Sequence, residues 1–309
     1  MNFLKPKFWD NDKNFVFPIL LIPIAVIIIL VGKIKKMFIK KHSFSIPIIC
    51  VGNIYLGGTG KTPFSIKLFT ILKYLKKNPA FIRKKYKAFG DEVSLQNQIG
   101  KVYQSKKRAD AISEAIKNNA NIVILDDGYQ DDSIKKNLNI VCFNEKQWIG
   151  NGFLIPSGPL RERLTALKRA NYVIINGKKN IDIENEIKKN NDQIKIFYIK
   201  YKPENIIKYK NKKVIGFAGI GNPNNFFDLL KENKINVLEE ISFPDHYHYS
   251  RKDLDKMIEK SEKSNAILIT TEKDYYRIDN EYKKNIQYLK IKTEIDKEKE
   301  FIEEIKKIL

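Results

Sequence analysis

Apolar runs of strand length alternate with amphipathic stretches along most of the chain after residue 45. Short apolar runs predict buried strands, whereas apolar residues three or four positions apart predict a helix. The first series of predicted strands comprises residues 46–51, 80–83, 122–125, 139–143, 172–175 and 196–201. Helical spacing is found in residues 63–75 and 109–117. The alternation predicts an α/β fold in which helices cover both faces of a parallel sheet.

A lysine-rich segment that contains a proline, residues 202–213, interrupts this pattern. A second series of strands is predicted at residues 213–217, 236–241, 266–270 and 286–291, and a charged helix is predicted near residues 296–308. We interpret the lysine-rich segment as a link between domains. The expected organisation is an N-terminal helix in residues 1–34, a parallel-sheet domain in residues 35–205 and a second, smaller α/β domain in residues 206–309.

The N-terminal part contains an uninterrupted apolar run, FVFPILLIPIAVIIILVG, at residues 15–32. Its length is at the lower edge of what crosses a bilayer. Pro18 and Pro23 are tolerated near the start of a membrane helix. Five lysines follow at positions 33, 35, 36, 40 and 41. By the positive-inside rule, this basic end lies on the cytoplasmic side. We therefore expect a helix that anchors the chain in a membrane, either by spanning it or by deep insertion.

Two other interpretations of the apolar run are possible, a cleaved signal peptide and a core helix. A cleaved signal peptide needs a short basic head and a cleavage site with small residues. Asp10 and Asp12 precede the run instead, and no A-x-A sequence follows it. A core helix of a soluble domain is the other alternative, but the run has no polar face to turn toward water. The membrane anchor is the interpretation that these features favour.

The formal net charge is +21, which suggests either an anionic partner or biased composition. Only seven of the 57 basic residues are arginine, and lysine and asparagine are abundant. This bias favours compositional drift as the main source of the charge. The two cysteines, Cys50 and Cys142, lie within predicted strands, so we expect buried free thiols in a reducing compartment. With no CxxC or His/Cys cluster, a zinc site is not expected.

A glycine-rich loop follows the first predicted strand, in the sequence ICVGNIYLGGTGKTP at residues 49–63. Glycines allow backbone N–H groups to converge on phosphate oxygens, and a helix N-terminus adds its positive dipole end. Lys61 would reach the β- and γ-phosphates of a nucleotide, and the Thr62 hydroxyl would bind Mg²⁺. The strict P-loop pattern has glycine where this chain has Tyr55. The predicted nucleotide-binding residues are Leu56, Gly57, Gly58, Thr59, Gly60, Lys61, Thr62 and Pro63.

An acidic pair ends another predicted strand, in the sequence IVILDDG at residues 122–128. Ligands of parallel sheets lie at the carboxyl ends of the strands. Asp126 and Asp127 are therefore predicted to bind the Mg²⁺ of the nucleotide. The alternative is a plain strand and turn, since Asp-Gly is common in turns. Together with the glycine-rich loop, the pair predicts a P-loop NTPase-like domain that uses ATP and Mg²⁺.

Several further segments occur in a fixed order after the apolar helix and the glycine-rich loop. They are GDE at 90–92, DDGYQ at 126–130, GNG at 150–152, PSGPLRE at 156–162, NG at 176–177, FPDH at 243–246 and TTEKD at 270–274. In this order the chain resembles the tetraacyldisaccharide 4′-kinase family of lipid A synthesis, over about residues 8–277. The combined pattern is far more specific than any of its motifs.

The resemblance implies a reaction. The enzyme would transfer the γ-phosphate of ATP to the 4′-hydroxyl of a tetraacylated glucosamine disaccharide 1-phosphate and release lipid IV-A. It would work at the cytoplasmic face of the inner membrane, held by its N-terminal helix. Its partners would be the lipid substrate and the membrane. We expect a monomer that does not bind nucleic acid.

The resemblance also implies catalytic residues. Asp91 matches the acid of the family's G-D-E motif, and a carboxylate near the acceptor hydroxyl can take its proton. The family pairs this acid with the histidine of its F-x-D-H motif, which is His246 here. Such a pairing would orient the acid and tune its pKa. No chemistry is expected of Lys273 and Asp274, which are predicted to shape a turn.

Arg161 and Glu162 match the family's L-R-E motif. Arg161 would neutralise charge on the transferred phosphoryl group, and Glu162 would join the acidic pair around Mg²⁺. An ion pair at a helix start is the alternative. The chain differs from the family at two places near the headgroup of the lipid. The S-R-G-Y-G stretch is represented only by the segment around Arg83, and Asp131 replaces a histidine.

Three other functions compete with that of a lipid kinase. A membrane-bound P-loop ATPase would not need the Asp91 and His246 segments. A nucleic-acid-binding protein is suggested by the charge alone, and that charge is spread along the chain. A kinase for a soluble sugar or cofactor would leave the apolar helix unexplained. The sequence thus favours a membrane-associated lipid kinase.

Overall fold

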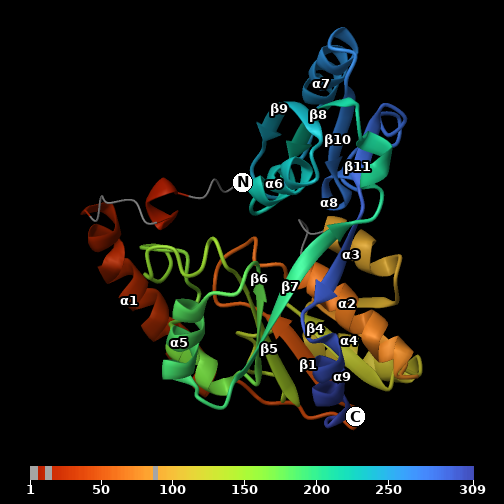
Figure 1. The fold of residues 1–309 in the computed structure, drawn as a ribbon. Coiled ribbons are helices and arrows are strands. Elements are labelled where there is room, and N and C mark those ends of the chain that lie inside the picture. The colour runs from red at the N-terminus through yellow and green to blue at the C-terminus, as the bar shows by residue number, and fades with distance from the viewer. Residues whose placement is uncertain (1–5, 11–15, 86–89) are drawn as a thin grey trace. The chain divides into compact units, whose positions relative to one another are not determined.

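The computed structural model describes residues 6–10, 16–85 and 90–309, and the chain divides into two compact units (Figure 1). Among these residues, the larger unit contains 6–10, 16–85, 99–200 and 294–309. The smaller unit contains 90–98 and 201–293. Each unit has its own sheet and its own buried apolar core.

The larger unit is built on an eight-stranded sheet with the order β12-β7-β6-β5-β1-β4-β2-β3. Its strands are β1 (Ile48–Gly52), β2 (Pro79–Lys84), β3 (Val102–Ser105), β4 (Ile122–Asp126), β5 (Leu138–Asn144), β6 (Tyr172–Asn176), β7 (Lys195–Pro203) and β12 (Ile291–Ile295). The strands from β7 to β3 pair in parallel. Every residue of β1, β4 and β6 is buried, as expected for strands covered on both faces. The predicted parallel α/β fold is confirmed.

The larger unit also contains five α-helices and two short 3₁₀ turns among the described residues. They are α1 (Val16–Met37), α2 (Lys61–Tyr74), α4 (Arg108–Lys117), α5 (Ile181–Asn190) and α9 (Glu298–Lys306), with short 3₁₀ turns η1 (Lys7–Asp10) and η2 (Leu164–Arg169). Both cysteines are buried free thiols, as predicted. Burial raises the pKa of Cys50 to about 11, so this thiol stays protonated at neutral pH.

The last helix, α9, packs beside α2 in the larger unit (Figure 1). Phe301 is fully buried and meets the rings of Phe64 and Phe197 edge-on, at centroid distances of 5.8 and 5.2 Å. Edge-to-face contacts of this kind stabilise aromatic clusters beyond their buried area. Lys67 of α2 also binds Glu298 at 2.7 Å. The C-terminal helix therefore supports the helix that begins at the glycine-rich loop.

Glu304 gives α9 a pH-dependent attachment to the sheet. Hydrogen bonds from Lys195 and Lys307 lower the pKa of Glu304 from 4.5 to about 2. A carboxyl group with a lowered pKa stabilises the fold above its ordinary value and loses that effect as the pH falls. We expect Glu304→Gln to lower the unfolding temperature at pH 7. The deficit should shrink as the pH falls from about 4.5 toward about 2.

Thermal unfolding of wild type and variant across this pH range measures the effect. The matched control is Glu303→Gln, because Glu303 is 64% exposed and its ion pair among the described residues is with Lys306 of the same helix. Such exposed pairs contribute little. An equal deficit for Glu304→Gln at pH 7 and at pH 3 would contradict the assignment.

The smaller unit has a four-stranded parallel sheet with the order β11-β10-β8-β9. Its strands are β8 (Lys213–Ala218), β9 (Asn236–Ser242), β10 (Ile267–Thr271) and β11 (Ile286–Leu289). Its helices are α3 (Gly90–Asn97), α6 (Asn224–Glu232), α7 (Arg251–Lys263) and α8 (Glu272–Tyr275), with the 3₁₀ turn η3 (Ile206–Tyr209). Ser250 caps α7 in a reciprocal capping box with Asp253.

The two units depart from the expected domain boundaries at residues 90–98 and 294–309. The first segment belongs to the smaller unit and the second to the larger one. The strand predicted at 286–291 is wrong in its extent, because β11 and β12 are separate strands in different sheets. At the break, the Lys290 N–H donates to Asn205 Oδ1 at 2.9 Å instead of to a strand. The predicted boundaries themselves stay a prediction.

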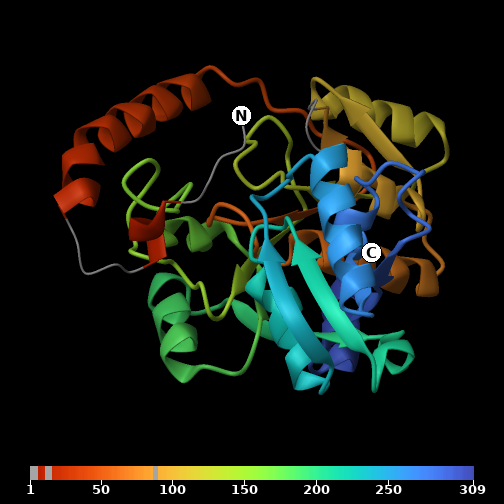
Figure 2. The same ribbon diagram turned by 90° about the horizontal axis from the view of Figure 1, so that it is seen from above.

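The N-terminal helix α1 is long and apolar enough to cross a membrane by length and composition. Only 11% of its apolar window is buried, so it is not a core helix. Figure 2 shows it along one margin of the larger unit. Large apolar side chains are exposed along its length, among them Phe17, Leu20, Ile27 and Ile34. A surface of this kind weakly suggests association with a membrane.

Candidate active site

The glycine-rich loop joins β1 to α2 and has left-handed backbone at three glycines. Gly57, Gly58 and Gly60 have φ angles of 82°, 61° and 88°. Residues with a Cβ atom rarely adopt this conformation, so these three positions favour glycine. Lys61 then begins α2, which places the N-terminus of the helix directly after the loop. The loop thus has the backbone of a phosphate cradle.

Tyr55 occupies the position at which the strict P-loop pattern has glycine. Its φ angle is not left-handed, so glycine is not required there. The side chain is fully buried, and its backbone forms an isolated antiparallel bridge with Leu160. On either side, the Leu56 N–H donates to Pro159 O at 2.9 Å, and the Arg161 N–H donates to Ile54 O at 2.7 Å. Residues 159–161 of the PSGPLRE segment therefore hold the start of the glycine-rich loop through backbone hydrogen bonds.

Two further hydrogen bonds hold the glycine-rich loop, one between its own residues and one from Gln130. Asn53 Nδ2 donates to Thr59 Oγ1 at 3.2 Å, and Gln130 Nε2 donates to Asn53 O at 2.8 Å. Asn53 is fully buried, so loss of this bond would leave a buried polar group without its partner. The DDGYQ segment thus contributes its glutamine to the glycine-rich loop.

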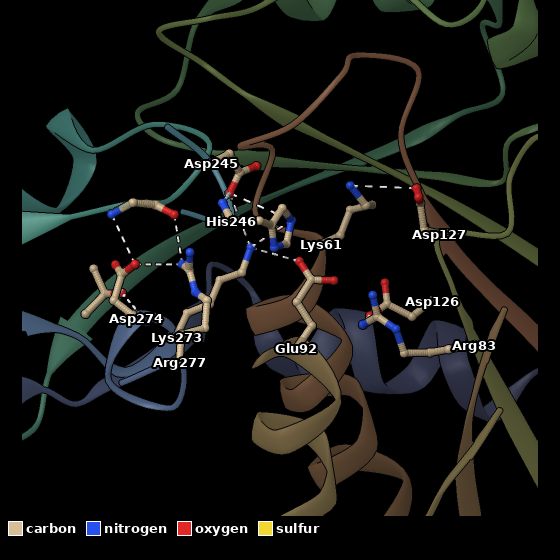
Figure 3. A network of polar contacts seen from close by, with 12 residues as sticks. Lys61, Arg83, Glu92, Asp126, Asp127, Asp245, His246, Lys273, Asp274 and Arg277 are labelled. Atoms are coloured by element: carbon tan, nitrogen blue, oxygen red, sulfur yellow. Dashed lines mark hydrogen bonds and ion pairs between the residues drawn. The ribbon is translucent and has the colours of Figure 1, made fainter. Parts of the chain in front are cut away.

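Asp127 lies where the loop, β4 and the PSGPLRE segment meet (Figure 3). The parallel pairing of β1 with β4 sets Val51 beside Asp126, and the Asp127 N–H donates to Val51 O at 2.9 Å. Arg161 Nη1 binds Asp127 Oδ1 at 2.8 Å, and Lys61 Nζ lies 3.7 Å from the same oxygen. The structure therefore brings together three of the predicted site residues.

Asp126 is bound instead by Arg83, at the end of the neighbouring strand β2. Arg83 Nη1 lies 2.6 Å from Asp126 Oδ2, and the two side chains are 8% and 1% exposed. Removing one member of a buried pair leaves an uncompensated charge and is strongly destabilising. The sequence placed Arg83 only near the lipid headgroup. Arg83 reaches Asp126 because β2 pairs with β4, and this pairing cannot be inferred from sequence spacing.

Glu162 has three partners on different segments. Lys36 Nζ lies 3.2 Å from Glu162 Oε1, and Gln130 Nε2 donates to Oε2 at 3.3 Å. Arg169 binds the same carboxylate. Gln130 thus connects Glu162 to the glycine-rich loop. Within residues 6–10, 16–85 and 90–309, no group of three or more His, Cys, Asp or Glu side chains that could hold a metal ion by themselves is found. The magnesium role of Glu162 stays a prediction.

Asp131, which stands where the family has histidine, forms a structural pair. Arg108 Nη1 binds Asp131 Oδ2 at 2.8 Å, and Arg108 Nη2 donates to Asp127 O at 2.7 Å. Burial acts to raise the pKa of Asp131, but hydrogen bonds from Ser133 and Arg108 outweigh it and keep the pKa below its usual value. The acid therefore stays charged and helps Arg108 to hold the backbone at Asp127.

His246 lies in the smaller unit, in the FPDH loop after β9 (Figure 3). Its backbone is left-handed, with φ 57°, and its N–H donates to Gly219 O at 3.1 Å and to Asp245 Oδ1 at 3.0 Å. A non-glycine residue in this region costs energy and is often found where a side chain has to be aimed. Lys273 Nζ lies 3.5 Å from His246 Nε2.

Asp274, for which the sequence predicted no chemistry, is fully buried and has several hydrogen-bond partners next to the FPDH loop. Its carboxylate accepts hydrogen bonds from Tyr249 Oη at 2.7 Å, Thr271 Oγ1 at 2.6 Å and the Gly219 N–H at 3.1 Å. Arg277 Nη2 binds Asp274 Oδ1 at 2.6 Å and also donates to Gly219 O at 2.8 Å. Asp274 and Arg277 therefore fix Gly219, whose carbonyl oxygen accepts the His246 N–H.

The side chain of Asp91 lies outside the described residues. Its helix, α3, belongs to the same compact unit as His246 and packs against α8. The next residue, Glu92, lies 3.1 Å from Lys273 Nζ through its Oε1 atom. The acid predicted to act as base and its predicted histidine partner thus sit on segments of one unit. Their pairing stays a prediction.

The inner strand β1 of a parallel sheet leads through left-handed glycines into a helix that begins with Lys-Thr. This arrangement defines a P-loop protein. The chain matches the family described as tetraacyldisaccharide-1-P 4′-kinase over residues 17–309, and it belongs to that family. It is a kinase by this membership.

Individual relatives agree with the family match. The chain is 43% identical to the tetraacyldisaccharide 4′-kinase of Pelagibacter ubique, covering 100% of this chain and 99% of that protein. It is 30% identical to the enzyme of that name from Parvibaculum lavamentivorans, with coverage of 89% and 86%. The crystal structure of LpxK from Aquifex aeolicus in complex with ATP is 25% identical, covers 95% of this chain and 99% of its own, and has a TM-score of 0.73.

Proposed function

We propose that this protein transfers the γ-phosphate of ATP to the 4′-hydroxyl of tetraacyldisaccharide 1-phosphate, which yields lipid IV-A. The observation that carries the proposal is the convergence of Lys61 and Arg161 on Asp127 beside a glycine cradle, in a chain of the 4′-kinase family. Two cations beside an anion-binding loop suit the charge of a triphosphate.

The nucleotide would bind in the loop formed by residues 56–63. Backbone N–H groups around the left-handed glycines and the N-terminus of α2 would hold the phosphate oxygens. Lys61 and Arg161 would turn from Asp127 to the β- and γ-phosphates when the nucleotide is bound. Because phosphoryl transfer needs mainly positioning and neutralisation of charge, these cations would contribute most of the catalysis on this side of the reaction.

The donor set beside the loop fits Mg²⁺. This ion prefers oxygen ligands, and carboxylates, phosphate oxygens and water are the usual ones. Thr62 lies in the first turn of α2, Asp126 ends the strand that pairs with β1, and Asp127 follows it directly. Glu162 is joined to the loop through Gln130. These four residues would hold the ion, which when bound would neutralise charge on the β- and γ-phosphates.

On the acceptor side, Asp91 would take the proton of the 4′-hydroxyl, and His246 would orient that acid. A sugar hydroxyl is a poor nucleophile, so a positioned carboxylate speeds its attack late in the reaction. Support comes from the shared unit of α3 and the FPDH loop, and from the network that fixes the His246 backbone. We also propose that the enzyme acts as a monomer.

Both ends of α1 are attached to the larger unit, and at its first end Phe17 stacks on Phe8 with ring centroids 6.5 Å apart. Before the helix, Trp9 Nε1 donates to Pro156 O at 3.1 Å, and Asn151 Nδ2 donates to Phe8 O at 3.0 Å. At its end, Lys36 binds Asp132 at 2.8 Å. A spanning helix has its two ends on opposite sides of an apolar layer about 30 Å thick. We therefore propose that α1 lies in the cytoplasmic face of the inner membrane without crossing it.

Cysteine labelling tests this orientation, because the two native thiols are buried. A membrane-impermeant thiol reagent is added to inverted inner-membrane vesicles that contain Val16→Cys or Met37→Cys protein. We expect both cysteines to react from the cytoplasmic side, since both ends of α1 stay with the catalytic unit. Reaction of the residue 37 cysteine alone would show a spanning helix. Recovery of the protein with the soluble fraction would contradict the anchor itself.

The test of the function is dependence on the acceptor. Purified protein, ATP and Mg²⁺ are incubated with tetraacyldisaccharide 1-phosphate or with unacylated glucosamine 1-phosphate. We expect a bisphosphate product from the lipid alone. ATP hydrolysis without any phosphorylated lipid would support the alternative, a membrane-associated P-loop ATPase. Efficient phosphorylation of the soluble sugar would support a kinase for another acceptor.

A further inference from the structure

The backbone of Asp127 is held on both sides in a conformation that most residues avoid. Its φ angle is 57°, in the left-handed region, and its carboxylate faces Lys61 (Figure 3). Aspartate tolerates this region better than most side chains, but a residue there persists only where its surroundings hold it. On one side, the Asp127 N–H donates to Val51 O of β1 at 2.9 Å. On the other side, the Asp127 carbonyl is bound by Arg108.

Arg108 is the first residue of α4 and reaches this carbonyl through its guanidinium group. Its Nη2 atom donates to Asp127 O at 2.7 Å, and the arginine side chain is only 6% exposed. Hydrogen bonds from a charged donor are stronger than those between neutral groups. Arg83 binds the carboxylate of Asp126, whereas Arg108 binds the backbone of Asp127. Arg108 can therefore fix Asp127 without occupying its acid group.

Asp131 sets the orientation of Arg108. Its Oδ2 atom binds Arg108 Nη1 at 2.8 Å, and its Oδ1 atom accepts hydrogen bonds from the N–H and the hydroxyl of Ser133, at 3.0 and 2.5 Å. The Asp131 N–H donates to Gly128 O at 3.1 Å. Because the donors of a guanidinium group have a fixed planar geometry, bonds at both terminal nitrogens determine where the group lies. Arg108 thus connects the two ends of the turn from residue 127 to residue 131.

We propose that Arg108, oriented by Asp131, is a positioning residue that aims the carboxylate of Asp127 at the phosphate site. The inference deepens the proposed function and rests on it, because there Asp127 pairs with two cations and would hold Mg²⁺. Replacing a residue that orients a metal ligand typically lowers metal affinity or activity by about 10- to 100-fold. Asp131 stands where the family has histidine, so the family motif alone does not identify this acid.

Replacing Arg108 with methionine removes the bond to the Asp127 carbonyl. We expect kcat to fall by about 10- to 100-fold, with little change in the KM for the lipid, because Arg108 would act on the nucleotide side of the reaction. Arg108→Lys keeps a charged donor and should restore part of the rate. Asp131→Asn keeps the size of the side chain and removes its charge, so it should lower kcat by a smaller factor. The control Lys107→Met, at an exposed position directly before α4, should match wild type.

Nucleotide binding tests whether Arg108 acts through Asp127, and it requires no lipid. The non-hydrolysable analogue AMP-PNP is titrated into wild type, Arg108→Met, Asp127→Asn and the double variant, either with Mg²⁺ or with EDTA. We expect each single variant to weaken binding in Mg²⁺ by about 10- to 100-fold and not to weaken it in EDTA. The double variant should bind no more weakly than Asp127→Asn, because a residue that acts only through Asp127 then has no carboxylate to position.

Three results would overturn the inference. One is a further loss of affinity in the double variant, which would give Arg108 an independent structural role. Another is an equal loss of affinity with Mg²⁺ and with EDTA. The third is a raised KM for the lipid at unchanged kcat, which would make Arg108 a contact of the acceptor. Because Arg108 is buried, the same comparisons with Asp131→Asn carry the test if Arg108→Met does not fold.

The outcome for Arg108 can be separated from the outcome for the proposed function. The expected binding results without any lipid phosphorylation would contradict the proposed function alone. Lipid phosphorylation at the wild-type kcat by folded Arg108→Met protein would contradict only the inference. Unchanged affinity of Asp127→Asn in Mg²⁺ would contradict both the magnesium role of Asp127 and the inference that Arg108 positions it.

Discussion

Replacing Lys61 with methionine will reduce phosphate transfer by about 10³-fold or more, because it removes a preorganised cation from the phosphate site. Lys61 lies at the start of α2, directly after the left-handed Gly60, and its side chain is 14% exposed. Its nearest described anion is Asp127, at 3.7 Å. Methionine keeps the apolar stem and loses only the charge. Initial rates of bisphosphate formation measure the effect.

Lys73→Met is the matched control, because Lys73 lies in the last turn of the same helix and bonds only to exposed Asn78 in the contacts described. We expect this variant to keep nearly full activity. Equal rates for Lys61→Met and wild type would remove the glycine-rich loop from the active site. Loss of activity in both variants would point to damage to α2 instead.

The second large effect is expected at Asp91. Asp91→Asn should lower kcat by about 10²- to 10⁴-fold, the usual contribution of a general base. The affinity for ATP should not change, because the predicted nucleotide contacts are all made by residues 56–63 and their neighbours. Asparagine preserves the size of the side chain and removes its basicity. Single-turnover rates and nucleotide titration of the same sample separate the two quantities.

Asp110→Asn serves as the control for Asp91→Asn, since Asp110 is an exposed acid in the first turn of α4. It should leave both quantities unchanged. Full activity in Asp91→Asn would remove the proposed base. A parallel loss of ATP affinity would assign Asp91 to the nucleotide site instead, and the roles of Asp91 and His246 would then have to be separated.

The sequence predicted the sheet of the larger unit well because its strands are buried on both faces and read as uninterrupted apolar runs. Sequence-based prediction failed where contacts between distant segments, and not the local apolar pattern, determine the strand boundaries or the packing partner of a helix. Lys290 lies between the apolar residues Leu289 and Ile291, and only the pairing of β12 within the larger sheet separates two strands there. Likewise, the apolar face of α9 shows that the helix packs somewhere, but the aromatic contacts of Phe301 determine where.

The candidate site was predictable where a motif carries its own backbone chemistry. The letters GGTGKT identify such a loop, and in the structure Gly57, Gly58 and Gly60 have left-handed backbone directly before α2. Contacts between distant segments could not be recognised in this way. Arg83 reaches Asp126 only because β2 pairs with β4, and Tyr55 is accommodated only because residues 159–161 strap the loop.

The smaller unit holds the clearest residues that sequence reasoning missed. A TTEKD motif looks like a strand followed by a turn, and nothing in its letters shows that Asp274 is fully buried beneath Gly219. A signal was nevertheless present. An aspartate, a lysine and an arginine at 273–277 directly follow an apolar strand, and charged groups brought to the edge of a buried strand need partners.

The position of the transferred phosphate tests the central claim most directly. The protein is incubated with ATP that carries a radiolabelled γ-phosphate, Mg²⁺ and tetraacyldisaccharide 1-phosphate, and the purified lipid is analysed for where the label resides. The account predicts one labelled phosphate per ATP consumed, attached to the 4′-oxygen, and no label in the Lys61→Met reaction. Label released as inorganic phosphate, or attached at any other oxygen of the disaccharide, would contradict it.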